Sequence, residues 1–287
     1  MKSTSRILAS PRARRAMRQR GINADALSGS GPGGRIVEAD VLRAVAQPGF
    51  TPLQTPAVGN LSPMRRAVAA KVTESSATVP HFYLRSEVDV TTLVALRQSV
   101  AETIEKQCGT RPSVTDFLLR AMALALHDHP QANRIWQNGS IVSLPSIDVG
   151  LVVQVEDGLL VPILHRADQF GLADIVRQRA GLTATIRSGK TPADIFQGGA
   201  TSLSNLGKTR VDEFTPIISP PQSSMLAVGR VAERPAACDG RLCLRQTVHL
   251  TLAVDHRVMD GVPAAEFFDR IVELLENPFL LLCETAR

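Results

Sequence analysis

An uncharged, proline-rich segment divides this chain into two parts of very unequal length. Residues 47–60, QPGFTPLQTPAVGN, contain three prolines and no charged side chain. Proline fixes φ and supplies no backbone N–H, so this composition favours an extended linker. The sequence therefore predicts a tail (residues 1–8), a small domain (9–46), the linker (47–60) and a large domain (61–287).

The positive charge of the chain is concentrated before the linker. Residues 1–46 hold nine basic and three acidic side chains, a net charge of +6, and the whole chain of 287 residues carries +5, which leaves −1 for the rest. A basic module on a nearly neutral body indicates an anionic partner for that module. Residues 1–46 contain no Phe, Tyr or Trp on which bases could stack, so we expect no nucleic-acid binding.

The small domain has the signals of two short helices around a glycine-rich loop. Ser10 before Pro11 is typical of a helix start, and Gly21 of its end. The loop at residues 28–34, SGSGPGG, is too rich in glycine for regular structure. A second helical pattern follows at 36–46, with Val37, Val41, Leu42 and Val45 expected on its apolar face.

The large domain mixes helical and strand periodicities, which predicts an α/β fold of the mixed α+β kind. Helices are expected at residues 65–75, 91–106, 115–127, 172–188 and 262–275. Strands are expected at 82–88, 148–155, 159–165, 200–206, 225–231 and 242–254.

Composition narrows the class of protein further. No window approaches the roughly 18 apolar residues of a membrane span, so we expect no membrane segment and a cytoplasmic protein. The four cysteines, Cys108, Cys238, Cys243 and Cys283, form no CxxC pair, and we interpret them as reduced structural thiols. His127 and His129 lack a third ligand nearby in the sequence, so no metal site is expected.

The strongest candidate for chemistry is a histidine at a strand end. The alternating segment 247–255 leads into His256, and Asp260-Gly261 follows before the last helix. Strand ends hold side chains rigidly yet leave them accessible, as catalysis requires. His81, in contrast, follows Pro80 at a strand entry and has no obvious partner.

These residues resemble a known family. His256-Arg-Val-Met-Asp260-Gly261 is similar to the active-site signature of the dihydrolipoamide acyltransferases, the core subunits of 2-oxoacid dehydrogenase complexes, which share their fold with chloramphenicol acetyltransferase. Further similar segments, in family order, are Leu61-Ser-Pro-Met-Arg-Arg66, Val79-Pro-His-Phe-Tyr83, Thr115-Asp-Phe117, Asp148-Val-Gly150, Asp157-Gly-Leu-Leu-Val-Pro162, Leu203-Ser-Asn-Leu-Gly207, Val211-Asp-Glu-Phe-Thr215 and Pro220-Pro-Gln222. Residues 9–36 resemble the peripheral subunit-binding domain of those proteins.

The resemblance implies a role for each site residue. His256 would be the general base on the thiol of coenzyme A or of a dihydrolipoyl group, and Ser204 would donate to the oxyanion of the tetrahedral intermediate. Asp260 would organise the loop through an ion pair, with Arg65 as the candidate partner. The segment after Ser204 would line the substrate channel with Asn205, Gly207, Lys208 and Arg210. Coenzyme A is then a substrate, and no metal is required.

The resemblance also implies partners. Family members form trimers, with the active site at the subunit interface and sometimes with larger cores built from trimers, so His256 and Ser204 could come from different subunits. The small domain would dock on dihydrolipoamide dehydrogenase or the decarboxylase component. Arg14 and Arg18, which share one helix face, and Arg35 would pair with carboxylates of that partner.

Two departures from the family keep alternatives open. Complete members begin with a lipoyl domain, and no such segment precedes residue 9, so the lipoyl group is expected only in trans. Lys208-Thr209-Arg210 replaces a hydrophobic–aromatic–glycine triplet. The alternatives are a coenzyme A-dependent acyltransferase with a non-lipoyl acceptor, outside a 2-oxoacid dehydrogenase complex, and a non-catalytic scaffold that binds dihydrolipoamide dehydrogenase.

Overall fold

The computed structural model describes residues 8–46, 61–156, 158–189, 192–238 and 240–283. The chain forms two compact units, residues 1–60 and 61–287. The predicted linker at 47–60, and all but residue 8 of the predicted tail, lie outside the described residues.

Two helices frame the first unit, as predicted. Helix α1 (Pro11–Arg20) begins where the Ser10 hydroxyl accepts a 3.1 Å hydrogen bond from the Ala13 N–H, and it ends at Gly21 in the left-handed region, φ 63°. Helix α2 (Glu38–Val45) follows two short 3₁₀ turns, η1 (Ala24–Ala26) and η2 (Pro32–Gly34). The loop between them requires glycine at Gly29, where a Cβ would lie 2.3 Å from the Gly34 carbonyl oxygen.

The core of the first unit is small. It consists of Ala13, Ala16, Met17, Ile22, Ile36 and Val41. Of the apolar face expected on α2, only Val41 is fully buried. Leu42 and Val45 remain exposed, so the buried stripe of this helix is shorter than its apolar face.

A buried carboxylate holds the glycine-rich loop on α2. Asp40 accepts hydrogen bonds from the Ser30 hydroxyl (2.6 Å), the Ser30 N–H (2.9 Å) and the Val37 N–H (3.0 Å). These bonds lower the pKa of Asp40 to about 2, the Ser30 hydroxyl contributing most. Because the carboxylate replaces missing backbone partners at the start of α2, it acts as part of the helix cap.

The second unit contains five helices and eleven strands among its described residues. The helices are α3 (Pro63–Thr78), α4 (Thr91–Cys108), α5 (Val114–Asp128), α6 (Leu172–Arg187) and α7 (Gly261–Glu276). The strands are β1 (His81–Asp89), β2 (Arg134–Gln137), β3 (Ser140–Ser143), β4 (Val149–Leu151), β5 (Val153–Val155), β6 (Gly158–Leu160), β7 (Ile163–Leu164), β8 (Thr201–Asn205), β9 (Ser224–Val228), β10 (Ala232–Cys238) and β11 (Arg241–Asp255). Short 3₁₀ turns add η3 (Pro130–Ala132), η4 (Ala167–Gln169), η5 (Ala193–Phe196) and η6 (Pro278–Leu282).

A mixed sheet organises this unit, and the predicted α/β class is confirmed. Its strand order is β1-β11-β9-β8-β4-β7, and β10 also pairs with β11. Strand β8 runs parallel to β4 and β9, whereas the remaining pairs of this sheet are antiparallel. Two small hairpins, β2–β3 and β5–β6, complete the strands.

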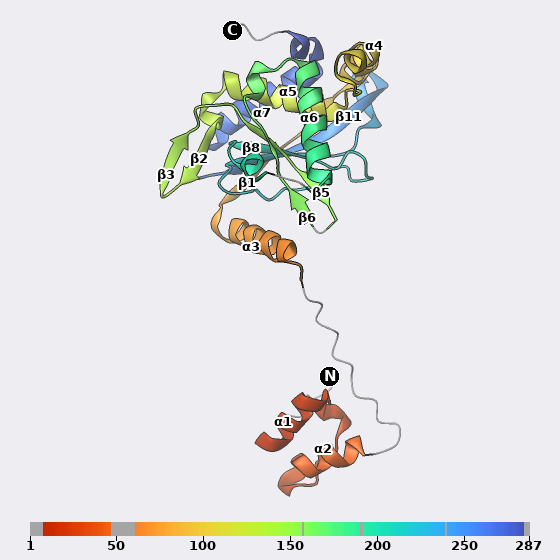
Figure 1. Cartoon of the computed structure of the whole chain (residues 1–287). Helices are drawn as coiled ribbons and strands as arrows, with labels where there is room; N and C mark the ends of the chain where they lie inside the picture. Colours follow the sequence, from red (N-terminus) through yellow and green to blue (C-terminus); the bar gives the residue numbers. More distant parts are fainter. Residues whose placement is uncertain (1–7, 47–60, 157, 190–191, 239, 284–287) are drawn as a thin grey trace. The chain divides into compact units, whose positions relative to one another are not determined.

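Helices cover the two faces of the sheet unequally. Helices α4 to α7 gather on one side (Figure 1), where they form the main core with the inward side chains of the sheet. Helix α5 is the centre of this layer, with ten of its fifteen residues buried. Helix α3 lies apart from this layer (Figure 1), and its one buried residue is Ser75, whose hydroxyl donates to the Ile218 carbonyl at 2.6 Å.

Three local features escaped the sequence prediction. The hairpin β2–β3 is too short and too exposed to produce a clear period, and β10 has the composition of a loop, with Pro235 inside it. Cys238 and Cys243 form a disulfide, whereas Cys108 and Cys283 are free. The expectation of four reduced thiols was therefore wrong for the pair that β10 and β11 bring together.

Candidate functional site

His256 lies in the turn that follows β11. Its backbone N–H donates a 3.0 Å hydrogen bond to the Pro80 carbonyl, just before β1. Its ring packs against Phe82 of β1, with ring centroids 4.8 Å apart. The side chain is 53% exposed, so the turn fixes a histidine that still faces solvent.

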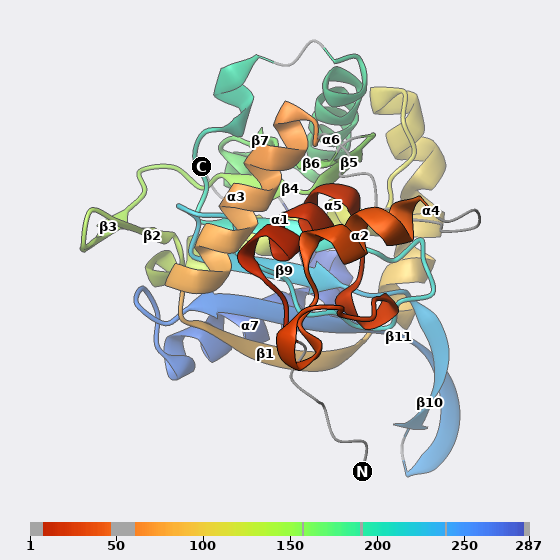
Figure 2. The ribbon, with the colours of Figure 1, turned by 90° about the horizontal axis from the view of Figure 1, so that it is seen from below.

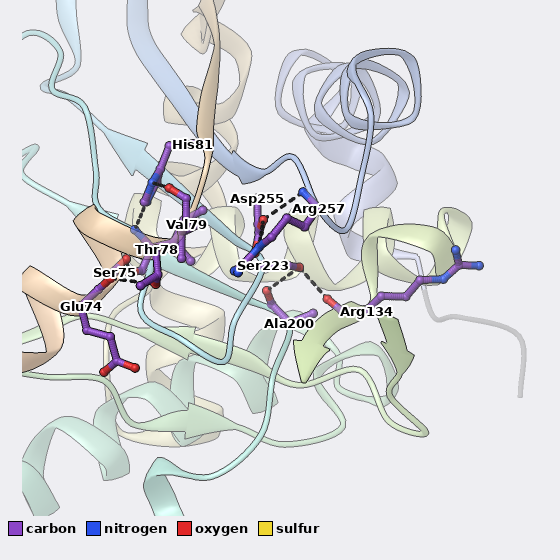
Figure 3. A network of polar contacts seen from close by, with 11 residues as sticks. Glu74, Ser75, Thr78, Val79, His81, Arg134, Ala200, Ser223, Asp255 and Arg257 are labelled. Atoms are coloured by element: carbon purple, nitrogen blue, oxygen red, sulfur yellow. Dashed lines mark hydrogen bonds and ion pairs between the residues drawn. The ribbon is translucent and has the colours of Figure 1, made fainter. Parts of the chain in front are cut away.

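The residues on both sides of His256 hold this turn in place (Figure 3). Asp255 is 1% exposed, and its carboxylate accepts hydrogen bonds from the Arg257 backbone N–H (3.0 Å) and guanidinium (2.7 Å from Nη2). These bonds raise the pKa of Arg257 above its usual value. The guanidinium also lies 5.1 Å from the centre of the Trp136 ring on β2. Sequence reasoning missed this pair, although an acid and a base that flank a candidate histidine are a visible signal.

Asp260 lies close to His256, not to Arg65. Its Oδ1 is 3.6 Å from His256 Nδ1, and its side chain is 84% exposed at the start of α7. The Arg65 backbone N–H bonds to Ser62 at the start of α3, and among the described residues no ion pair joins Arg65 to Asp260. The single chain therefore does not form the expected Arg65–Asp260 pair, which stays a prediction.

His81 has two partners, contrary to the sequence interpretation. Its Nδ1 lies 2.8 Å from the Val79 carbonyl, and its Nε2 lies 3.1 Å from the Ile218 N–H. A carbonyl can only accept and an N–H can only donate, so this arrangement suits a ring that donates from Nδ1 and accepts at Nε2. His81 thus attaches the segment before Pro220 to the start of β1 (Figure 3).

The buried polar groups beneath His256 link several elements. The Asp255 N–H donates to the Ser223 carbonyl at 2.8 Å, and the Ser223 hydroxyl donates to the Arg134 carbonyl. These contacts join the end of β11 to the start of β9 and to the hairpin β2–β3 (Figure 3). The end of the sheet that carries His256 is therefore fixed by backbone contacts as well as by Asp255.

Ser204 is the second-last residue of β8, just before the loop. Its side chain is half-buried, and within the described part of the chain its hydroxyl makes no hydrogen bond. Its neighbour Asn205 is fixed on both sides, donating to the Thr115 hydroxyl at 3.1 Å and accepting from the Gly207 N–H at 2.7 Å. A Cβ on Gly207 would lie 2.8 Å from the Asn205 Oδ1. The strand end is rigid, and the Ser204 hydroxyl remains available as a donor.

The loop after Gly207 exposes two cations. Lys208 and Arg210 are exposed, and no ion pair joins either to another described residue. Asp212 anchors the far end of this loop, since its Oδ1 lies 2.7 Å from Arg230 Nε and 2.6 Å from Arg234 Nη2. Hydrogen bonds from Arg230, and then from Arg234, lower the pKa of Asp212.

The register of the sheet keeps Ser204 away from His256 in one chain. Ser204 pairs with Ala227 on β9, and Ala227 pairs with Thr251 on β11. His256 comes five residues after Thr251, which corresponds to about 17 Å along an extended strand, in addition to two strand spacings of about 4.8 Å each. The structure therefore does not bring the two predicted catalytic groups together within a single copy.

In the first unit, two of the three predicted docking arginines lie together. Arg14 and Arg18 line a shallow pocket with Met17, Gly21, Ile22, Asn23 and Ala24. Arg35 is exposed but is not part of this lining. Apolar atoms between two cations can receive a partner's aliphatic side chain while its carboxylates pair with the arginines.

The described residues form neither a membrane span nor a metal site. No helix there is long and apolar enough to cross a membrane. No group of three or more His, Cys, Asp or Glu side chains there is arranged to hold a metal ion.

Nearly the whole chain is similar to proteins of one family. Residues 54–283 match the family model described as 2-oxoacid dehydrogenases acyltransferase (catalytic domain), and residues 7–42 match the model described as e3 binding domain. The acetyltransferase component of the Rickettsia conorii pyruvate dehydrogenase complex is 35% identical over 97% of this chain and 69% of its own length. The mitochondrial counterpart from Caenorhabditis elegans is 37% identical over 98% of this chain and 57% of its own length.

A solved structure adds a comparison at the site. Dihydrolipoamide acetyltransferase from Azotobacter vinelandii superposes with a TM-score of 0.76 at 29% identity, covering 83% of this chain and all of that chain. A serine, a histidine and an asparagine were investigated there for their role in the catalytic mechanism. In that protein the histidine follows the serine by 52 residues and precedes the asparagine by four. Ser204, His256 and Asp260 have the same spacing, with aspartate in the third place.

Proposed function

This chain belongs to the 2-oxoacid dehydrogenase acyltransferase family, and we propose that it transfers an acyl group between a dihydrolipoyl thioester and coenzyme A. The domains we propose are a subunit-binding domain at 9–46 and a catalytic domain at 61–287, with a tail at 1–8 and a linker at 47–60. The separation of Ser204 from His256 within one copy is the observation on which the proposed architecture of the site rests.

His256 is the proposed general base. Its Nδ1 faces Asp260 at 3.6 Å, which leaves Nε2 to accept the proton of a thiol. The thiolate attacks the carbonyl carbon of the acyl thioester, and a new S–C bond forms while the carbonyl π electrons move to oxygen. Collapse of this intermediate breaks the old S–C bond, and the departing thiolate recovers the proton from the imidazolium.

Ser204 is the proposed oxyanion donor. Three observations support it: its hydroxyl has no partner among the described residues, its strand end is rigid, and its 52-residue spacing to His256 matches that of the serine and histidine investigated in the Azotobacter protein. Such a donor stabilises the transition state most when it needs no reorganisation. Asn205 and Gly207 hold this position, and Lys208 and Arg210 lie at the mouth of the channel.

The proposed active site lies between copies of the chain. Because the sheet register puts Ser204 about 17 Å along the strands from His256, one copy would supply His256 and a neighbour would supply the serine. A cyclic trimer satisfies every such site with one kind of interface. Larger multiples of the trimer remain compatible with this arrangement.

Complementation between two inactive variants tests this arrangement. His256→Ala and Ser204→Ala are co-expressed with different affinity tags, and oligomers that contain both are purified and assayed for acetyl transfer from acetyl-CoA to dihydrolipoamide. In a mixed cyclic trimer, one of the three sites pairs an intact His256 with an intact Ser204 from its neighbour. We therefore expect about a third of wild-type activity. Activity no higher than that of the two separate variants would show that both groups act within one chain.

The first unit is the proposed docking module for dihydrolipoamide dehydrogenase or the decarboxylase component. Support comes from its net charge of +6 over residues 1–46, its match to an e3 binding domain, and the exposed arginines Arg14, Arg18 and Arg35. We expect the full chain with Arg14→Gln and Arg18→Gln to lose binding to the dehydrogenase. A chain with Arg12→Gln and Arg15→Gln is the matched control, since these exposed arginines of α1 do not line the pocket. Equal loss of dehydrogenase binding in the two double variants would indicate nonspecific charge attraction.

A further inference from the structure

Strands β10 and β11 form an arm that leaves the rest of the sheet. Strand β11 pairs with β1 from Thr247 onward and with β9 from Leu250 onward, but its residues 241–246 pair only with β10. Figure 2 shows this two-stranded ribbon extending beyond the other strands. The Cys238–Cys243 disulfide closes the ribbon next to its tip.

The two sulfur atoms of this disulfide have different surroundings. Arg245 Nε donates a 3.1 Å hydrogen bond to Cys238 Sγ, and the same Nε lies 3.6 Å from Asp89 Oδ2 at the end of β1. Among the described residues, no such cation contacts Cys243. Both cysteines are half-buried, so a small molecule can reach the disulfide, and a guanidinium is placed to stabilise Cys238 as a thiolate.

We propose that Cys238 and Cys243 form a dithiol–disulfide exchange site whose substrates are small dithiols of the dihydrolipoyl class. The inference rests on the proposed function only for the source of that dithiol, because an enzyme that handles dihydrolipoyl groups meets them at every turnover. The disulfide itself, its accessibility and its guanidinium neighbour are independent of acyl transfer.

The asymmetry of the site sets the order of bond changes. A thiolate of the dithiol attacks Cys243 Sγ and breaks the bond to Cys238, whose sulfur leaves as a thiolate beside Arg245; a well-stabilised leaving thiolate makes this step faster. The second thiol of the substrate then attacks the substrate's own first sulfur, which is bonded to Cys243 Sγ in the mixed disulfide. This attack closes a cyclic disulfide in the substrate and releases Cys243 as a thiolate. Two electrons pass to the cysteine pair, two protons follow them, and no further oxidant or reductant is needed.

Ring closure favours completion of the exchange over a trapped intermediate. The second thiol of a dihydrolipoyl group is held near the mixed disulfide by its own carbon chain, so its attack is intramolecular and has a high effective concentration. A monothiol lacks this step and must wait for a second molecule. The site therefore distinguishes dithiols from monothiols by the number of sulfurs that one molecule supplies.

The test maps thiols on the full chain with dihydrolipoamide as the probe. The chain is given Cys108→Ser and Cys283→Ser, purified without reductant, mixed with dihydrolipoamide, and alkylated at intervals before peptide mass analysis. We expect Cys238 and Cys243 to resist alkylation at first and to become alkylated together. Arg245→Met should slow this reaction about 3- to 10-fold, because the leaving thiolate loses its hydrogen-bond donor.

Arg241→Met is the matched control, since among the described residues this exposed arginine at the same tip donates no hydrogen bond to either sulfur. Complete alkylation of both cysteines before the probe is added, persistent resistance at millimolar probe, or equal slowing in the two arginine variants would each overturn the proposal. The measurement uses neither coenzyme A nor an acyl group, so failure here is separate from failure of acyl transfer.

Discussion

The two ends of the main sheet carry the two proposed catalytic groups, and they are built differently. At one end, His256 is held by the Pro80 carbonyl, the Phe82 ring and the buried Asp255 next to it. At the other end, the Ser204 hydroxyl has no partner among the described residues, and the following loop exposes Lys208 and Arg210. The histidine end therefore has its supporting contacts within one chain, whereas the serine end keeps polar groups without partners among the described residues.

This difference separates two requirements of catalysis. A general base must be aimed, and around His256, the proposed base, lie fixed dipoles and the Asp255–Arg257 ion pair. An oxyanion donor must receive a substrate, and the hydroxyl of Ser204, the proposed donor, has no partner among the described residues. Substitutions at the first end should therefore affect stability and turnover together, whereas replacement of Ser204 or of the exposed cations at the second end should affect catalysis or binding alone.

Loss of the guanidinium beside Asp255 should have the largest effect. Arg257→Met keeps an apolar side chain next to the Trp136 ring. It leaves the Asp255 carboxylate, which is 1% exposed, without its charged partner. We expect the free energy of unfolding to fall by about 3 kcal/mol and kcat to fall at least about tenfold as the turn loses its position. Urea unfolding and steady-state acyl transfer measure the two effects.

The double variant Asp255→Asn with Arg257→Met controls for loss of packing, because it removes the stranded charge. Most of the lost unfolding free energy should return in it. If the double variant is as unstable as Arg257→Met alone, the ion pair is not what holds the histidine end.

Ser204→Ala tests the opposite end and should separate catalysis from stability. Removal of one oxyanion donor costs about 3 kcal/mol of transition-state stabilisation, so kcat should fall roughly 100-fold. The free energy of unfolding should stay within about 0.5 kcal/mol, because the hydroxyl has no partner to lose. Loss of stability comparable to that of Arg257→Met would contradict the contrast between the ends.

The regular elements of this fold were largely predictable from the sequence. The helices α4 to α7 carry strong apolar periods, and β11 alternates over its inner half, so their existence followed from pattern alone. Strand β10 and the hairpin β2–β3 did not, because β2 and β3 have only four residues each, all of β3 is exposed, and β10 contains Pro235, which is unusual inside a strand. The position of His256 at a strand end followed from alternation; its contacts with Pro80 and Phe82, distant in sequence, could not.

Long-range contacts also set a limit on prediction at the site. The Arg65–Asp260 pair was inferred from a resemblance, because no local pattern relates residues on separate elements, and it stays a prediction. His81 was left without a partner because its partners include the backbone N–H of Ile218, 137 residues away. Backbone donors of this kind have no signature in sequence.

Asp212, at the far end of the loop after Ser204, should make the stability of the serine end depend on pH. Hydrogen bonds from Arg230 and Arg234 lower its pKa in the folded chain, so the stability it contributes is full above the ordinary aspartate pKa of about 4 and is lost as the pH falls through the lower folded value. The urea midpoints of the wild type and Asp212→Asn should differ near neutral pH and converge in acid. Asp269→Asn, at an exposed position of α7 without an ion pair in the described residues, should show no such convergence. A constant gap at all pH values would mean that Asp212 acts through packing instead of charge.

The smallest effect is expected from the exposed cations of the serine end. Lys208→Gln and Arg210→Gln remove charges that have no ion-pair partner among the described residues, so stability should not change. Coenzyme A carries phosphate groups, and each variant should raise its KM about threefold at low salt while kcat is kept, because an exposed cation attracts an anion without contacting the reacting atoms. The difference should vanish at about 0.5 M salt, where the Debye length falls to a few ångströms. Lys106→Gln on α4 makes the same charge change at another exposed position, and an equal rise in KM there would assign the effect to net charge and not to the loop.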